Sequence, residues 1–206
     1  MSPTGKHLKD IEIVGGHPAL DFVNTVHSWR MEPAPDYLHG FDDLLAWQRN
    51  FDLVGRHAAT RWSAAPEAEK ARAFRGAVAL RAALRRIFAA AAAGEPVPVD
   101  PLDHLTGVVR RTARWRRLAA DEGTGRRMLR WVWELTEAPA TAIVGPVAWQ
   151  AADLLAEGNL DRLKECPGDN CGWLFLDTSR NRSRTWCSMK TCGNAAKVKR
   201  FRQRAK

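Results

Sequence analysis

Cysteine is absent from the first 165 residues of this 206-residue chain, which confines thiol chemistry to its last quarter. The sequence also lacks any run of about 18 apolar residues, which excludes a transmembrane helix. Its opening residues, Met1 to Lys6, lack the apolar stretch of a secretory signal. We therefore expect a cytoplasmic protein with no membrane partner, in which clustered thiols stay reduced and more often bind metal than form disulfides.

Recognisable catalytic motifs are absent as well. The six histidines show neither an H-x-x-x-H nor an H-E-x-x-H pattern, so no catalytic metal site is indicated. The chain contains no nucleophile elbow, no phosphate-cradling loop and no dinucleotide-binding fingerprint. We therefore do not expect an enzyme.

The cysteines that are present form two matched pairs, Cys166 with Cys171 and Cys187 with Cys192. Each pair encloses four residues, and fifteen residues separate the pairs. Two such knuckles can supply four thiolates to one tetrahedral Zn²⁺, closing a structural site with no open coordination position. Two disulfides, an iron–sulfur cluster and four unrelated buried thiols are the alternatives, and the cytosol, the paired spacing and the following basic segment favour zinc.

Positive charge is concentrated in the same module. Residues 166–206 contain ten Lys and Arg and two Asp (+8), and the rest of the chain, with 22 basic and 21 acidic residues, carries +1 of the total +9. This partition is typical of a polyanion-binding protein, because Lys and Arg displace the counterions of phosphates. A solubilising tail is the plain alternative, and RNA is the main rival to DNA as the partner.

A basic helix is predicted after Cys192, with Asn194 as its cap. We expect Ala195, Val198, Phe201 and Ala205 to pack on the finger and leave basic flanks for a DNA groove. Asn181 and Gln203 are candidates for base contacts. The basic candidates for DNA binding are Arg180, Arg182, Arg184, Lys197, Lys199, Arg200, Arg202 and Arg204.

The preceding body is predicted to be mainly helical. Apolar spacing and breaker residues predict helices after Pro18 and over 41–55, 66–93 and 140–157. A short strand is predicted over Ile11–Val14, and a hairpin over 108–135 with its turn near 121–125. Between the second and third cysteines, 173–176 is predicted to be a strand.

His17, Asp21 and Asn24 recur at roughly helical spacing beside Gly15-Gly16. They are candidates for a ligand pocket, which would make the body a sensor. The alternative, which we prefer, is that Asp21 and Asn24 satisfy local backbone groups and His17 packs at the surface, because polar residues at helix starts usually cap.

Two segments resemble known families. The stretch from Cys171 to Asn194, with Trp173-Leu-Phe-Leu-Asp and Trp186-Cys-Ser-Met-Lys-Thr-Cys-Gly-Asn, resembles the CGNR-type zinc finger of bacterial proteins. Gly15-Gly-His-Pro-Ala-Leu-Asp-Phe-Val-Asn-Thr25 is similar to the opening of the ABATE domain that usually precedes that finger. The resemblance implies a stress-induced transcription regulator. The family's Cys-Gly-Asn-Arg signature ends in Ala195 here, so a contact from that arginine is not carried over.

The expected fold class is therefore α+β. A predominantly helical domain with a small β-hairpin, residues 1–160, precedes a treble-clef-like four-cysteine zinc finger, residues 161–206, that ends in a basic helix. The expected function is DNA-binding transcription regulation, with the first domain sensing a small-molecule effector or forming a homodimer. The alternative is a small-molecule-binding or RNA-binding protein whose finger is a structural or interaction module.

Overall fold

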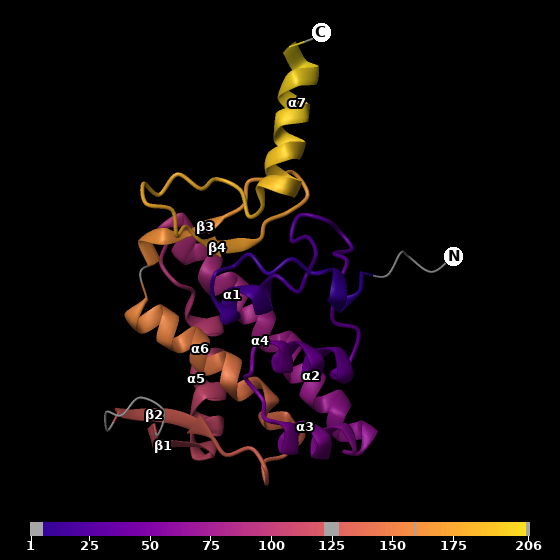
Figure 1. Ribbon diagram of the computed structural model, residues 1–206, viewed down its shortest axis with the longest axis vertical. Coiled ribbons are helices and arrows are strands. Elements are labelled where there is room, and N and C mark those ends of the chain that lie inside the picture. Colours follow the sequence, from indigo (N-terminus) through magenta and orange to yellow (C-terminus); the bar gives the residue numbers. More distant parts are fainter. Residues whose placement is uncertain (1–5, 122–127, 159, 205–206) are drawn as a thin grey trace.

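Figure 1 shows the computed structural model of the chain, which describes residues 6–121, 128–158 and 160–204. A helical body lies below the cysteine module, and the last helix rises away from both (Figure 1). The α-helices are α1 (Pro18–Val23), α2 (Phe41–Asn50), α3 (Arg56–Ser63), α4 (Glu67–Ala93), α5 (Val99–Thr112), α6 (Val144–Glu157) and α7 (Asn194–Arg204). The strands are β1 (Arg116–Asp121), β2 (Met128–Trp133), β3 (Leu163–Glu165) and β4 (Leu174–Leu176). The described chain is mainly helical and has two small antiparallel sheets. Its fold class is therefore α+β, as predicted.

Helix α4 is the centre of the body and packs against α1, α2, α5, α6 and β3. Its alanine-rich sequence favours helix, and its apolar stripe of Leu80, Leu84, Ile87 and Phe88 is fully buried. Gly94 ends the helix with φ of 70°, the left-handed conformation that glycine adopts without steric penalty. The helix predicted over 66–93 is thus confirmed.

The predicted hairpin begins later than expected. Residues 108–112 belong to α5, and the first strand starts at Arg116, which pairs with Trp133 in an antiparallel ladder. Leu105 and Val108 lie one turn apart and are buried, so the packing of α5 against α4 and α6 outweighs the β-preference of its valines. The predicted turn, apart from Asp121, lies outside the described residues.

The strand predicted over Ile11–Val14 is wrong, because this segment is irregular. It runs beside β4, where the amide of Leu176 donates to the carbonyl of Gly15 (2.9 Å). Strand β4 spans three residues and pairs with β3 along one edge, and on its other edge the amide and carbonyl of Leu174 are bonded to the Asn24 side chain. The segment therefore joins the sheet by an isolated contact rather than by a ladder.

The cysteine module is docked on the body through buried polar contacts. The Asn24 side chain, 0% exposed, donates to the carbonyl of Leu174 and accepts from its amide, both at 2.9 Å. The Trp173 indole N–H donates to the carbonyl of Val26 (2.8 Å). At the edge, Glu165 forms ion pairs with Arg30 (3.0 Å) and Arg85 (2.8 Å). Hairpin β3–β4 is therefore part of the same packed unit as α1 and α4.

None of the helices in the described ranges is both long and apolar enough to cross a membrane.

Candidate metal centre and nucleic-acid interface

The four cysteine sulfurs converge at the junction between hairpin β3–β4 and helix α7. Cys166 follows β3 and Cys171 precedes β4, so the first knuckle is the turn of that hairpin. Cys187 ends the long loop after β4, and Cys192 lies in a π-helical turn, Met189–Gly193, that continues directly into α7. The second knuckle therefore sets the direction in which α7 leaves the finger.

The geometry of the sulfurs fits one zinc ion. All four Sγ atoms lie within 4.8 Å of one another, with Cys171–Cys187 at 3.6 Å and Cys187–Cys192 at 3.7 Å. A tetrahedral site with Zn–S bonds of about 2.3 Å places its sulfurs roughly 3.8 Å apart. A disulfide requires about 2.05 Å, and all four cysteines are free thiols. The predicted structural Zn²⁺ is therefore supported over two disulfides.

Glycines at two positions let the first knuckle close. A Cβ atom on Gly168 would lie 3.1 Å from the Cys192 sulfur and 3.2 Å from the Cys171 Cβ, inside the ligand cluster. Gly172 has φ of +79°, and a Cβ there would meet Trp29 at 3.2 Å. The first knuckle thus depends on close approach at Gly168 and on a left-handed backbone at Gly172, immediately after Cys171.

Asp177 organises the loop between the cysteine pairs, and the sequence analysis missed it. Its buried carboxylate accepts from the amides of Ser179 and Arg184 (both 2.9 Å) and from the Lys164 ammonium (2.6 Å). Burial alone would raise the pKa of Asp177, but the hydrogen bonds from Lys164 and Ser179 outweigh it and hold the pKa well below its usual range. The loop therefore has a charged anchor, and the signal that could have revealed it is that Asp177 is the only acidic residue in the basic stretch 170–206.

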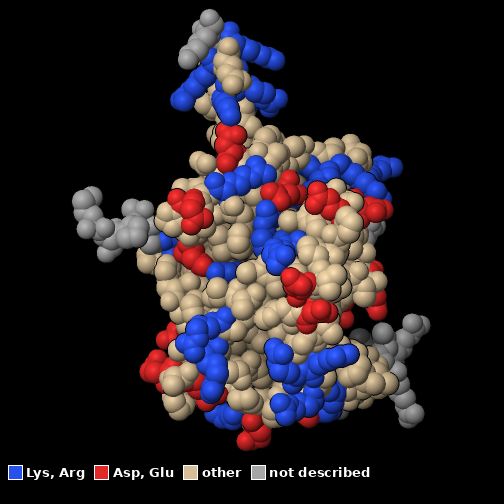
Figure 2. All heavy atoms as spheres, turned by 180° about the vertical axis from the view of Figure 1, so that it is seen from behind, with Lys and Arg blue, Asp and Glu red and all other residues tan. Residues whose placement is uncertain are grey.

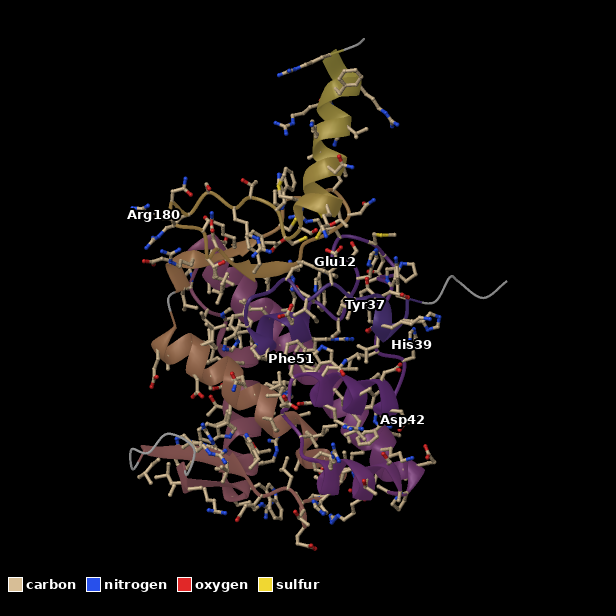
Figure 3. All side chains as sticks on the ribbon, in the orientation of Figure 1. Glu12, Tyr37, His39, Asp42, Phe51 and Arg180 are labelled. Carbon is tan, nitrogen blue, oxygen red and sulfur yellow. The ribbon has the colours of Figure 1, made fainter. Side chains whose placement is uncertain are left out.

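The predicted DNA-binding arginines of this loop, Arg180, Arg182 and Arg184, form an alternating arginine strip, and only part of it points to solvent. Arg180 and Arg182 are exposed, and Figure 3 shows Arg180 pointing outward at the edge of the finger. Arg184 instead lies 4.2 Å above the ring of Phe175 and donates to the carbonyls of Val14 (2.9 Å) and Trp186 (3.1 Å). Its guanidinium is therefore engaged within the fold, where it ties the finger to the segment before α1.

Helix α7 projects away from the molecule, and every side chain from Asn194 to Arg204 is at least partly exposed (Figure 1). The expectation that an apolar face packs on the finger is wrong, because Val198 is 40% and Phe201 is 73% exposed; Ala205 lies outside the described residues. The expected cap is also wrong, since Asn194 has helical dihedrals and continues the π turn.

The basic residues of α7 differ in their surroundings. Lys199 pairs with Asp169 across the base of the helix (2.6 Å). Within the described ranges, no ion pair is found for Lys197, Arg200, Arg202 and Arg204. These cations therefore remain available to an external anion.

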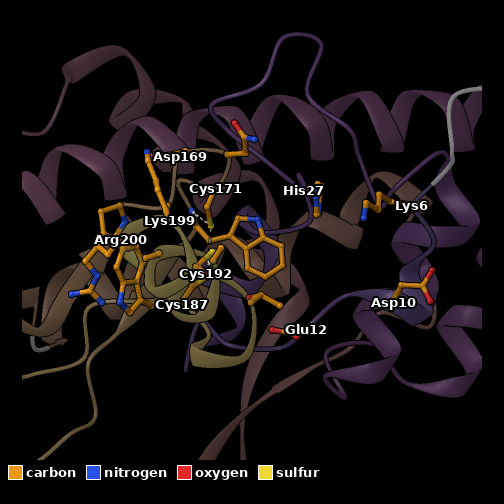
Figure 4. A pocket seen from close by; sticks show the side chains of 18 of the residues that line it. Lys6, Asp10, Glu12, His27, Asp169, Cys171, Cys187, Cys192, Lys199 and Arg200 are labelled. Carbon is orange, nitrogen blue, oxygen red and sulfur yellow. Dashed lines mark hydrogen bonds and ion pairs between the residues drawn. The ribbon is translucent and has the colours of Figure 1, made fainter. Parts of the chain in front are cut away.

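A cleft of about 960 Å³ separates the base of α7 from the body. Figure 4 shows Lys199 and Arg200 at one end and Lys6 and Asp10 at the other. Its floor contains aromatic side chains and zinc-site cysteines, namely Tyr37, Trp173, Trp186, Cys171, Cys187 and Cys192. Sequence reasoning missed this cleft, because its walls come from residues more than 100 positions apart.

His27 and Tyr37 form a polar pair in this cleft. The His27 Nδ1 lies 2.9 Å from the Tyr37 hydroxyl. Burial lowers the pKa of His27, with the nearby Lys6 charge acting in the same direction, and burial raises the pKa of Tyr37. Both side chains are therefore held in their neutral forms near pH 7, as hydrogen-bonding groups rather than charges.

The candidate pocket residues of the body have separate roles. His17 is the N-cap of α1, its Nδ1 accepting from the Ala19 amide (3.3 Å), and burial lowers its pKa. Asp21 accepts from the amides of Val14 (3.0 Å) and Gly15 (2.8 Å). Burial raises the pKa of Asp21 to about 6, although these bonds and Arg184 oppose the rise.

His17 and Asp21 also line one shallow surface depression, together with Arg184. Asn24 is turned away from it, toward Leu174. The structure therefore brings two of the three predicted pocket residues together, and it gives Asp21 and Asn24 backbone partners, one local and one 150 residues away.

Two family models match the chain. A family model described as "Putative stress-induced transcription regulator" (ABATE) matches residues 16–158, more than half of the chain. A second, described as "CGNR zinc finger", matches residues 162–205. No curated protein matches the chain. The resemblances seen in the sequence are thereby confirmed, in the predicted order.

Proposed function

We propose that this chain, which belongs to the ABATE family and carries a CGNR zinc finger, is a DNA-binding transcription regulator. In this proposal the zinc ion does no chemistry and instead folds the finger and directs α7 at the nucleic acid. The observation that carries the proposal is α7 itself, a fully solvated helix with five described Lys and Arg residues that begins at a metal ligand.

The distribution of charge supports a polyanionic partner. The module 166–206 carries +8 of the net +9, and Figure 2 shows basic side chains covering the part of α7 seen from behind. An exposed 11-residue helix has marginal stability in water, so a bound polyanion would stabilise α7 as well as neutralise it. A merely solubilising tail would need neither a metal site nor a directed helix.

The proposed interface combines α7 with the loop that Asp177 anchors. Lys197, Arg202 and Arg204 are exposed on α7, and Arg180 and Arg182 are exposed on the loop. Lys199 and Arg200 lie on the cleft side of α7, where they can reach phosphates flanking the contact. Arg184 is left out of the interface, because its donors are used within the fold.

The direct test is fluorescence anisotropy with genomic DNA fragments, with and without a zinc chelator. We expect binding that weakens with salt and is lost on chelation. Replacing Lys197 or Arg202 by Gln should reduce the slope of log K against log salt by about 0.9 for each contact removed. Arg75→Gln, an exposed charge on α4, is the matched control and should change nothing. Tight binding that survives chelation would contradict the proposal, and preferential competition by single-stranded RNA would favour the RNA alternative.

A second candidate function, small-molecule sensing by the body, is favoured by the cleft at the base of α7. Its volume of about 960 Å³ lies at the upper end of the range typical of ligand pockets. A ligand there would touch both the body and Ala196, Lys199 and Arg200 of α7, and so could alter DNA binding directly.

Native mass spectrometry of the protein as purified tests the sensing role. A co-purifying small molecule that is absent from an Ala196→Trp variant, in which the cleft is filled, would support it. A bound molecule retained by that variant would place the ligand elsewhere, with the depression at His17 and Asp21 as the next candidate. The same spectra report whether the protein is a homodimer. A regulator of bacterial genes would act in the cytoplasm, which we propose as its location.

A further inference from the structure

Helix α7 presents opposite faces to the body and to solvent. The residues that line the cleft, Ala195, Ala196, Lys199, Arg200 and Gln203, are spaced three or four apart and therefore share one face. At 3.6 residues per turn, Val198 and Phe201 lie on the opposite face. Gln203, a sequence-based candidate for base contacts, thus faces the cleft, and the side that DNA would meet first is apolar at its centre.

Basic residues flank this apolar centre on both sides. Lys197 and Arg204 lie along one flank of the face and Arg202 lies along the other. The apolar centre is therefore bordered by cations on both sides. Phe201 is 73% exposed and Val198 40%. An exposed aromatic ring between cations on a projecting helix indicates a partner with apolar groups between two rows of negative charge.

A DNA major groove has this arrangement. Its two phosphate backbones border a groove about 12 Å wide that admits an α-helix, and the C5-methyl groups of thymine are the apolar groups on its floor. Two copies of α7 would repel each other, because residues 194–204 contain five Lys and Arg and no Asp or Glu. A bilayer surface is disfavoured, because two apolar side chains bury too little area to hold the helix there.

We propose that Phe201 and Val198 are specificity-determining residues that contact thymine methyl groups in the major groove, while the flanking cations contact phosphates. This inference rests on the proposed DNA-binding function and adds how sequence would be read. A phenyl ring and an isopropyl group cannot hydrogen-bond to base edges, but they can bury a methyl group.

The test compares duplexes that differ only in the C5-methyl group. One pair is alternating A-T against alternating A-U, and the other is alternating G-5-methylcytosine against alternating G-C, each about 21 base pairs or two helical turns long. The zinc-loaded full chain should bind the methylated member of each pair more tightly, by about fourfold for each methyl group buried. Phe201→Ala should lose the part of the preference that the ring contributes, Phe201→Ala combined with Val198→Ala should bind both members equally, and Phe201→Leu should keep more of the preference than Phe201→Ala.

Leu129→Ala is the matched control, because Leu129 is 67% exposed on β2, far from α7, and should leave the preference unchanged. Equal affinity of the unaltered protein for both members would overturn the inference while leaving DNA binding intact. A preference that is undiminished in Phe201→Ala, or that persists when Val198→Ala is added, would also overturn it. Absence of salt-dependent binding to all four duplexes would instead refute the proposed function. Phe201-dependent binding to phosphatidylglycerol vesicles in place of DNA would make α7 a membrane-surface helix and overturn both.

Discussion

Hairpin β3–β4 and helix α7 meet at the same four sulfurs, yet their surroundings are opposite. Trp173, Leu174 and Phe175 are buried, and Leu174 is held by both atoms of the Asn24 amide. Every described side chain of α7 is in contact with solvent. The finger is therefore held by the metal and by the body on one side, whereas α7 is held by its ligand knuckle and by the exposed ion pair between Lys199 and Asp169 at its base. This difference separates the part that supports the finger from the part that is free to bind.

Removing zinc should produce the largest effect and tests the comparison directly. Zinc contributes about 10–16 kcal/mol to the folding of isolated finger peptides, so chelation or Cys166→Ser should abolish DNA binding. Hydrogen exchange followed by mass spectrometry should show residues 187–204 losing protection, while 163–176 stays partly protected by its contacts with the body. Added Zn²⁺ should restore the protected state and Mg²⁺ should not. Equal loss in both segments would show that docking does not hold the hairpin.

Breaking the docking contact should have the next largest effect. Asn24→Ala leaves the buried amide and carbonyl of Leu174 without partners, each at a cost of about 1–3 kcal/mol, so unfolding free energy should fall by roughly 2–6 kcal/mol. Denaturant unfolding of the zinc-loaded protein measures this. Asn50→Ala, at the exposed end of α2, is the control and should change stability by less than about 0.5 kcal/mol. A loss no larger than the control's would mean that the metal alone supports the hairpin.

A smaller, pH-dependent effect is expected at Asp21, beside the segment that Arg184 ties to the finger. Its folded-state pKa of about 6 exceeds the ordinary 3.8, so the folded state keeps the proton longer and loses stability as pH rises between these values. Asp21→Asn retains an oxygen for the Val14 and Gly15 amides and has no charge to bury. The variant's stability relative to wild type should therefore rise by up to about 3 kcal/mol from pH 4 to pH 7.

The measurement for Asp21 is the difference in unfolding free energy between variant and wild type across that pH range, in which the contribution of zinc cancels. Asn50→Ala, an exposed substitution that removes no titratable group, serves as the control and should give a flat difference. A flat difference for Asp21→Asn as well would show that the hydrogen bonds from Val14 and Gly15 fully offset burial of the carboxylate.

The smallest effect on stability is expected from substitutions in α7. Phe201→Ala and Val198→Ala should change thermal stability by no more than about 0.5 kcal/mol, because exposed side chains lose little burial when truncated. Differential scanning calorimetry of the free protein measures this. Phe175→Ala, which removes a fully buried ring from the finger, is the contrasting variant and should cost about 3–5 kcal/mol. Marked destabilisation by Phe201→Ala would mean that α7 packs against the molecule after all.

Local sequence patterns correctly predicted the extent of α4 and the zinc ligands, because both depend on residues close together in the chain. The extent of α4 followed from its alanine-rich stripe and Gly94, and the zinc ligands followed from the matched spacing of the cysteines. Helix α5 was missed because Val108, Val109 and Thr112 resemble strand residues, and only burial against α4 and α6 makes the helix favourable. The start of the first hairpin strand was misplaced for the same reason.

The candidate site shows the same limit at the level of single residues. Arg184 and Arg180 belong to one alternating arginine strip, but the structure places the guanidinium of Arg184 over Phe175 and leaves Arg180 in solvent. Asn24 and Leu174, which join the body to the finger, are 150 residues apart, and no short motif connects them. Which polar groups are used internally depends on contacts between such distant segments.

The amino-acid sequence alone thus specifies a four-thiolate zinc site and the concentration of positive charge around it, because metal ligation and charge density depend on residue type and short spacing. The tertiary fold decides which arginines remain available, where the cleft opens, and that Val198 and Phe201 face solvent rather than the finger. Burial is a property of surfaces that segments far apart in the chain create together, and the body offers no surface on the outer side of α7. The helix is therefore left exposed in the direction that the second cysteine knuckle gives it.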